Sequence, residues 1–325
     1  MRIRPELATL RSDPAPQRLA QQQLADALER WRGSPLAAAV DADLERYAAG
    51  CALDDLPALA LLFDPHEPAA HSLCEAFTAA MLAELERNPF GLVLVRHFTD
   101  DLISSVMLLR RGTATIALQA IDGAALERRP QPVSATFSPT ETVELVLAGS
   151  GTAECARLVG EGPGGASIAR SSMAVQAGTV SHRNGESEAR WFSRVEGSLV
   201  SLKLQRRPVS GGILREYLLA DGTLAHQAAA SSRDSRLELT ATLLGRMGRS
   251  DAAPLLAAMA EEQGSPAMRW QVLRECLALD SAEGFRALAG IARKADDPLS
   301  APAGALRAQL LEQYPVLAGV EPCPA

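Results

Sequence analysis

The sequence predicts an α+β protein in which a central antiparallel β domain is flanked by helical regions. The spacing of apolar residues carries this prediction, because it is helical up to about residue 90, alternates with polar residues from there to about residue 230, and then becomes helical again. A chain of 325 residues is long enough for two or three domains. We therefore expect an N-terminal helical region at 1–90, a β domain at 91–230 and a C-terminal helical domain at 231–325.

Four helices are expected in the N-terminal region. The first begins near Gln17, and the sequence Gly33-Ser34-Pro35 ends it. The other three are expected over Leu36–Tyr47, Leu56–Phe63 and residues 68–87. In the last of these, apolar side chains recur every four residues, at Leu73, Phe77, Met81 and Leu85.

The β domain has its clearest strand at Ser198–Arg206. Apolar Val200, Leu202 and Leu204 alternate there with polar Ser201, Lys203 and Gln205, so we expect one apolar face and one face in water. Turns are expected where glycines interrupt the alternation, at Arg111-Gly112, Asp122-Gly123, Gly149-Ser150-Gly151, Gly197 and Asp221-Gly222. About ten short strands separated in this way predict a sandwich or a barrel.

Two stretches of the β domain carry a resemblance to a known family. Arg96-His97-Phe98-Thr99-Asp100-Asp101 and the segment 177–184, in which Gly178 precedes His182 and Asn184, resemble the two motifs of the cupin superfamily over about residues 91–230. The first motif of that family carries two histidines and a glutamate, whereas this chain has only His97 there. The resemblance implies a cupin-like antiparallel β barrel or sandwich.

The same resemblance implies a divalent metal, such as Fe, Mn, Ni or Zn. Its ligands would be His97, Asp101 and His182, with His226 as a further ligand if it faces inward. The alternative is that His97 and His182 are ordinary turn or surface histidines and that His226 is a hydrogen-bonded strand residue.

The C-terminal region contains an internal repeat. A shift of 32 residues lays Ser250-Asp251-Ala252 on Ala282-Glu283-Gly284 and Ser265-Pro266 on Asp297-Pro298. Over residues 235–317 these helix pairs resemble HEAT-like repeats, which implies a surface for proteins or extended ligands. A helical cap on the β domain is the alternative. Before the repeat, Arg233 and Arg236 fit either an interdomain ion-pair cluster or an anion site.

Composition excludes several classes of protein. The net charge of −7 and the pI near 5.4 argue against nucleic-acid binding, which needs clustered basic residues. No apolar run approaches the roughly 18–20 residues that span a bilayer, so no membrane role is expected. The five cysteines form no Cys-x-x-Cys pair, and the N-terminus has no apolar leader. We therefore expect free thiols and a cytoplasmic protein.

No complete catalytic constellation is visible in the sequence. The leading hypothesis is therefore a non-catalytic binding or regulatory protein that contacts a protein partner through its helical surfaces and whose β domain is structural or holds a small-molecule ligand. The rival hypothesis is a cupin-like, metal-dependent oxygenase or isomerase. Whether the protein is an enzyme stays open at this point, as do its ligand and its oligomeric state.

Overall fold

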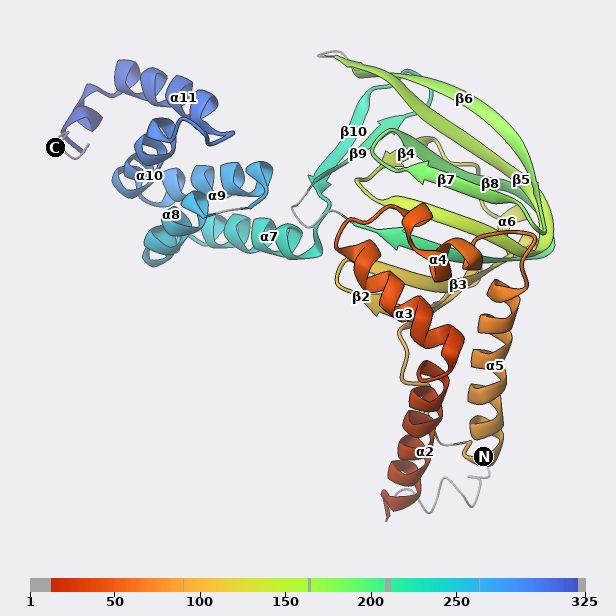
Figure 1. The fold of residues 1–325 in the computed structure, drawn as a ribbon. Helices are drawn as coiled ribbons and strands as arrows, with labels where there is room; N and C mark the ends of the chain where they lie inside the picture. Colours follow the sequence, from red (N-terminus) through yellow and green to blue (C-terminus); the bar gives the residue numbers. More distant parts are fainter. Residues whose placement is uncertain (1–12, 90, 163–164, 208–211, 263, 321–325) are drawn as a thin grey trace, which may run out of the picture. The chain divides into compact units, whose positions relative to one another are not determined.

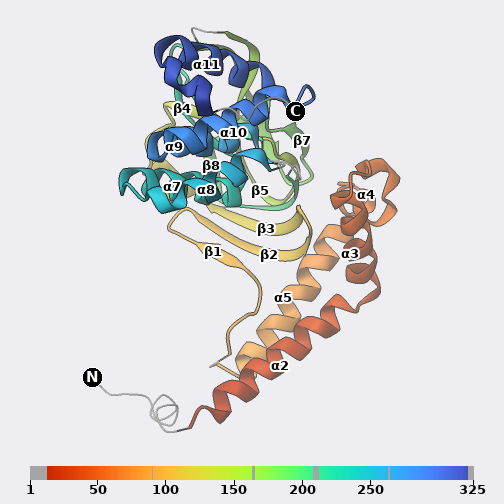
Figure 2. The same ribbon diagram turned by 90° about the vertical axis from the view of Figure 1, so that its left-hand side faces the viewer.

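The computed structural model describes residues 13–89, 91–162, 165–207, 212–262 and 264–320. It divides into two compact units, one of residues 1–207 with 218–223 and the other of residues 208–217 with 224–325 (Figures 1 and 2). The N-terminal helices and the large sheet belong to the first unit, and the C-terminal helices belong to the second.

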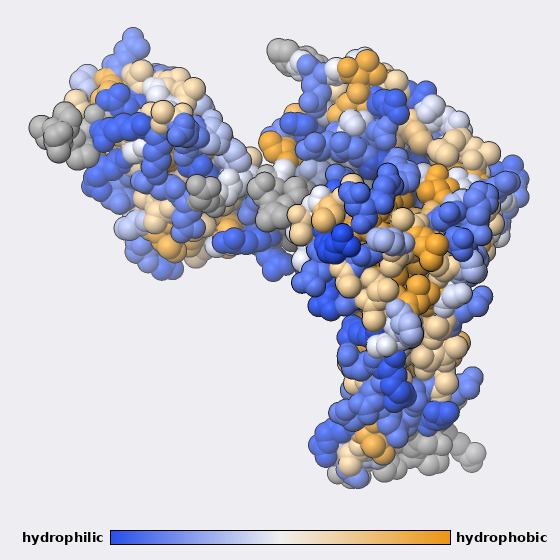
Figure 3. Space-filling view, viewed as in Figure 1, coloured by the Kyte–Doolittle hydropathy of each residue, from blue (hydrophilic) through white to orange (hydrophobic). Residues whose placement is uncertain are grey.

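The expected N-terminal helices are confirmed. They are α2 (Ala15–Arg32), α3 (Pro35–Ala48), α4 (Pro57–Leu62) and α5 (Ala69–Arg87), with the short 3-10 helix η1 (Leu53–Asp55) before α4. The outer side of α2 is covered mainly by hydrophilic residues (Figure 3), as expected for an amphipathic helix. None of the helices in the described part of the chain has an apolar stretch long enough to cross a bilayer.

The first unit is built on a seven-stranded antiparallel sheet in the order β1-β2-β3-β8-β5-β6, and β7 also pairs with β5. Its strands are β1 (His97–Thr99), β2 (Ile103–Arg111), β3 (Ala114–Asp122), β5 (Glu141–Gly162), β6 (Gly165–Gln176), β7 (Val180–Asn184) and β8 (Glu188–Arg206). The short helix α6 (Gly123–Glu127) and the strand β4 (Ser134–Phe137) lie between β3 and β5 in the chain.

Two expectations about the β domain are wrong in detail. Within the described residues, β1 at one edge does not pair with β6 or β7 at the other, so the sheet is curved but does not close into a barrel. The pair Asp122-Gly123 is not a hairpin turn. Instead, the Asp122 carboxylate accepts a hydrogen bond from the Ala125 amide at 2.7 Å, which caps the N-terminus of α6.

Strands β5 and β8 are long and continuous, which corrects the expectation of turns at Gly149–Gly151 and at Gly197. The two strands pair from Glu141 with Arg206 to Arg157 with Glu188, and the register shifts at three places between residues 146 and 153. Gly149 lies at these bulges with φ +89, and a Cβ there would lie 2.2 Å from the Ser198 carbonyl oxygen. The glycines therefore bend the paired strands where the sequence predicted that they end.

The two faces of the sheet differ in polarity. Leu202 and Leu204 of β8 pack with Val143 and Leu145 of β5 in the core that the N-terminal helices cover. The opposite face was expected to be in water, but it is enclosed by the curved sheet, and Ser201 is 0% exposed. The alternation was predicted correctly, whereas the surroundings of its polar half were not.

Arg206 connects the sheet to the N-terminal helices. Its guanidinium lies 4.2 Å from the centre of the Tyr47 ring and donates to the Tyr47 and Cys51 carbonyls at 2.8 and 3.1 Å. It also pairs with Glu141 at 2.6 Å. Because Tyr47 lies at the end of α3, this one side chain holds that helix end to the sheet.

The second unit contains the strand pair β9 (Ile213–Leu218) and β10 (Leu224–Ala229), followed by helices. The helices are α7 (Ser232–Arg246), α8 (Ala253–Glu261), α9 (Pro266–Leu279), α10 (Ser281–Arg293) and α11 (Ser300–Gln313), with 3-10 segments η2 (Ser250–Ala252) and η3 (Pro315–Val320). Their shared core includes Leu256, Val272, Leu273, Phe285 and Leu288, each at most 2% exposed. Paired helices were expected here and are found.

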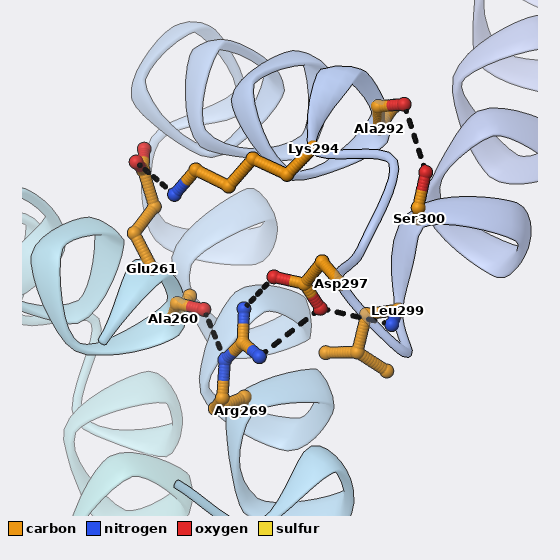
Figure 4. Close-up of polar contacts among 8 residues, drawn as sticks. All are labelled: Ala260, Glu261, Arg269, Ala292, Lys294, Asp297, Leu299 and Ser300. Atoms are coloured by element: carbon orange, nitrogen blue, oxygen red, sulfur yellow. Dashed lines mark hydrogen bonds and ion pairs between the residues drawn. The ribbon is translucent and has the colours of Figure 1, made fainter. Parts of the chain in front are cut away.

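A buried ion pair joins three helices of this unit (Figure 4). Arg269 of α9 donates to both carboxylate oxygens of Asp297, at 3.1 and 2.6 Å, and to the Ala260 carbonyl of α8 at 2.8 Å. Asp297 also accepts from the Leu299 amide just before α11 at 2.9 Å. Hydrogen bonding from Arg269 lowers the pKa of Asp297 below its ordinary value.

The bend at Gly149 should be intolerant of a side chain. We expect Gly149→Ala to lower the stability of the first unit by about 2–4 kcal/mol, because it combines a positive φ with a backbone clash. Gly160→Ala is the matched control on the same strand, since a Cβ at Gly160 meets nothing within 4 Å. Urea-dependent labelling of buried Cys74 measures this unit separately. Equal stabilities of the two variants would contradict a strained bend.

The Arg269–Asp297 pair should make the second unit sensitive to acid. Because the pKa of folded Asp297 lies below its unfolded value, its stabilisation is complete above that unfolded value, near 3.8, and is lost as pH falls through the folded pKa. We expect the stability difference between the wild type and Asp297→Asn to be full at about pH 6 and to shrink below about pH 4. Labelling of the buried Cys276 in urea measures the stability of this unit. Asp296→Asn removes a neighbouring exposed carboxylate and is the control. A difference that stays constant down to pH 3 would refute this account.

Candidate functional site

A buried carboxylate organises the polar inner face of the sheet. The Glu144 side chain is 1% exposed and accepts a hydrogen bond from the Ser201 hydroxyl at 2.7 Å. Lys203 Nζ lies 3.4 Å from one of its oxygens, and Arg190 forms an ion pair with the other. One carboxylate thus faces two cations in a place where water is largely excluded.

The bend in β5 and β8 brings these groups together. In the ladder Glu144 is opposite Lys203, whereas Arg190 is opposite Cys155, on the far side of the glycines. Arg190 nevertheless reaches Glu144 and donates to the Ser181 hydroxyl of β7 at 2.6 Å. The site therefore exists only because the paired strands fold back on themselves.

A cavity of about 410 Å³ adjoins this cluster. Its charged lining consists of the guanidiniums of Arg183, Arg190 and Arg207 and the carboxylate of Glu188. Hydroxyl and amide groups line much of the rest. The remaining lining residues are Pro132, Ser134, Ala135, Thr136, Ser138, Thr140, Thr142, Gly185, Ala189, Trp191 and Gln205.

Arg183 is the cation of this cavity that the protein leaves uncompensated. It is half-buried on β7, and no carboxylate among the described residues lies within ion-pair distance of it. The nearby Glu188 pairs with Arg157 at 2.6 Å. Burial lowers the pKa of Arg183, with Glu188 opposing that effect. A partly desolvated guanidinium that faces a cavity favours the binding of an anion.

Lys203 adds to the positive character of the inner face. Its side chain is 21% exposed, and burial, assisted by the charges of Arg190 and Arg183, lowers the pKa of its amine to about 7. Burial also lowers the pKa of Arg190. Both shifts arise first from burial, and for Lys203 the neighbouring charges of Arg190 and Arg183 add to it.

The cavity does not suit a divalent metal ion. Metals of this kind need several neutral imidazoles or carboxylates directed at one point. Here the charged lining is three guanidiniums and one carboxylate, and that carboxylate is already paired. In the part of the chain that the structure describes, no group of three or more His, Cys, Asp or Glu residues could hold a metal.

None of the four predicted metal ligands is among the residues that line this cavity. His97 is exposed on β1, and Asp101 is exposed and pairs with Arg129. His182 is exposed on β7, which is separated from β1 in the sheet by β2, β3, β8 and β5. His226 is exposed on β10 of the second unit. His97 and His182 therefore lie on strands that are not neighbours in the sheet, and the metal site formed by the four residues stays a prediction.

Sequence reasoning missed Arg183, the residue next to His182. Neighbouring strand residues point to opposite faces, so Arg183 takes the inner face together with Ser181 while His182 takes the outer one. A signal was present in the segment 134–142, where every second residue is Ser or Thr, which places a row of hydroxyls on one side of an extended chain. The other predicted anion-binding residues, Arg233 and Arg236, are both exposed on α7.

Comparisons with known proteins place the chain in no family. No protein-family model matches it, and no curated protein matches it. Among solved structures it is similar to cupin-fold proteins. A Momordica charantia 7S globulin is 19% identical with a TM-score of 0.27 over 38% of this chain and 35% of that chain. A variant of Bacillus subtilis oxalate decarboxylase is 12% identical with a TM-score of 0.25 over 38% and 30%.

Ectoine synthase from P. lautus is 11% identical to this chain, with a TM-score of 0.24 over 35% of this chain and 70% of that one. The chain thus spans about a third of the length of the globulin and of the decarboxylase. All these TM-scores lie below 0.5, so the functional argument rests on the geometry of the cavity.

The lowered pKa of Lys203 has a consequence for stability. Between about pH 7 and the unfolded lysine pKa of about 10.4, the unfolded state binds more protons than the folded state, so stability attributable to Lys203 should rise with pH. We expect the stability of the wild type relative to Lys203→Met to rise by at most about 1.4 kcal/mol per pH unit over that window. Urea unfolding followed at Cys74 tests this, with Gln176→Met at an exposed β6 position as the control. A pH-independent difference would contradict the shift.

Proposed function

We propose that the first unit binds a small organic anion in its arginine-lined cavity and that the protein acts as a non-catalytic binding or regulatory protein. The observation that carries this proposal is Arg183, a half-buried cation directed to a cavity with no carboxylate in ion-pair distance among the described residues. A bound carboxylate or phosphate would supply the missing negative charge in a bidentate arrangement.

Arg190 is a second cation of the cavity, and its guanidinium has a fixed position. Arg190 lines the same cavity while Glu144 and Ser181 fix its guanidinium from behind. Arg207 adds an exposed charge at the boundary of the cavity. A fixed guanidinium loses little side-chain entropy when a ligand binds, which favours affinity.

The size of the cavity supports a small ligand. Ligand pockets typically have volumes of about 300–1,000 Å³, and this one, at about 410 Å³, lies toward the lower end. A macromolecular anion would instead need an extended basic surface, and the net charge of −7 argues against one.

Two other predictions stay proposals. A protein partner on the helical surfaces rests on the sequence alone. The rival function, a metal-dependent oxygenase or isomerase, is not favoured by the cavity, because guanidiniums cannot bind a metal and would repel it. Metal analysis of the purified protein, with and without His97→Ala/His182→Ala, decides that alternative.

Charge should determine binding to the cavity. We expect glutarate or D-gluconate to bind in isothermal titration, while the neutral compounds glutaramide and D-glucose bind at least about tenfold more weakly. Added salt should weaken the binding of the anions and leave that of the neutral compounds unchanged. Arg183→Gln should reduce the affinity for the anions by about tenfold or more. Arg110→Gln, at an exposed position of β2 in the same sheet, should leave that affinity unchanged. Equal binding of anions and neutral compounds, or an unaffected Arg183→Gln, would refute the proposal.

A further inference from the structure

A row of hydroxyl groups lines the cavity beside its arginines, and Thr142 is the direct cross-strand neighbour of Arg183. Every second residue from 134 to 142 carries a hydroxyl, and all of them line the cavity: Ser134, Thr136, Ser138, Thr140 and Thr142. Of the four intervening residues, Ala135, Phe137 and Pro139 are buried, whereas Glu141 is exposed and pairs with Arg206. Burial of Phe137 and Pro139 anchors the segment, while the five hydroxyl-bearing residues line the cavity.

The backbone holds the middle of this row in place. The Ser138 amide donates to the Gly185 carbonyl at 2.8 Å, and the Gly185 amide donates to the Thr140 carbonyl at 2.9 Å. A Cβ at Gly185 would lie 2.4 Å from the Ser138 carbonyl oxygen, so only glycine permits this approach. Gly185 follows Arg183 by two residues, and the clamp therefore fixes the hydroxyls relative to that guanidinium.

Hydroxyls and guanidiniums recognise different parts of a ligand. A guanidinium only donates hydrogen bonds, whereas a serine or threonine hydroxyl both donates and accepts. The Ser138 and Thr140 hydroxyls lie 3.3 Å apart and bond to each other, and the Thr142 hydroxyl accepts from Gln205 at 3.4 Å. A ligand with several hydroxyls can join such a network, while a plain hydrocarbon chain would leave it unmatched.

Trp191 adds a flat apolar surface to the same cavity. Its ring lies beneath Arg170, 5.9 Å from that guanidinium, and it lines the cavity together with Ala189. A ring or chain that is polar at its edges and apolar on its C–H face fits a cavity lined by both hydroxyls and an indole.

We infer that the cavity binds a hydroxylated organic anion, namely a sugar acid or a sugar phosphate. The acid group is bound by Arg183 and Arg190, and the hydroxyl groups are bound by the row from Ser134 to Thr142. This inference rests on the proposed anion-binding function and adds to it the recognition of the ligand's hydroxyl groups. Glu188 is the one carboxylate in the lining, and its ion pair with Arg157 keeps its charge compensated.

Isothermal titration of the full chain with a ligand series tests the inference. D-gluconate and glucose 6-phosphate carry both an acid group and hydroxyls, hexanoate and inorganic phosphate carry charge alone, and D-glucose carries hydroxyls alone. We expect at least one of the first pair to bind about tenfold more tightly than each of the other three. The preference between gluconate and glucose 6-phosphate then distinguishes a carboxylate from a phosphate.

A double variant removes two hydroxyls of the row and keeps the shape of both side chains. Thr136→Val/Thr140→Val should weaken the preferred sugar anion about fivefold to tenfold and leave hexanoate binding unchanged. Thr240 is exposed on α7, so Thr240→Val is the control for the same chemical change.

The outcomes separate the two proposals. If gluconate, glucose 6-phosphate, hexanoate and phosphate all bind equally, the role of the hydroxyl row is refuted while anion binding stands. If no anion binds, both proposals fail. The comparison among ligands uses the wild type, so it holds even if the double variant does not fold.

Discussion

The bend in the paired strands β5 and β8 is the constraint on which the first unit depends. Gly149 adopts a positive φ against the Ser198 carbonyl, and the register shifts repeatedly beside it. Without the bend, Arg190 and Glu144 would lie far apart on one flat ladder. With it, the outer face of the sheet packs on the N-terminal helices, and the inner face closes around a cluster of charges. The same glycines thus determine both the core and the cavity.

Electrostatics then gives the inner face its character. Burying cations is unfavourable unless anions compensate them, and here one buried carboxylate, Glu144, serves both Arg190 and Lys203. Arg183 receives no such partner within the described chain. Local arrangements that oppose stability are found where function requires them. Burial lowers the pKa of both Lys203 and Arg183, and for Lys203 the nearby guanidiniums of Arg190 and Arg183 add to this effect.

The second unit follows a different design. Its helices bury mainly alanine and leucine side chains, with Phe285 as a buried aromatic residue, in keeping with an aromatic content of 4%. The buried ion pair between Arg269 and Asp297 is compensated within itself and by the carbonyl of Ala260. That pair joins helices and leaves no charge for a ligand. Arg183 differs from this pair in that no carboxylate among the described residues lies within ion-pair distance of it.

The sequence by itself determined the kind and the boundaries of most elements. The helical spacing located α2 to α5 within a few residues and identified 231–325 as helical, and the alternation at Val200–Gln205 identified both faces of β8, because these periods depend only on neighbouring residues. Only the tertiary structure decided where the polar face points, that Gly149 bends a strand instead of ending it, and that Arg183 rather than His182 faces the cavity. Curvature and strand pairing arise between residues far apart in the chain, so local patterns do not encode them visibly.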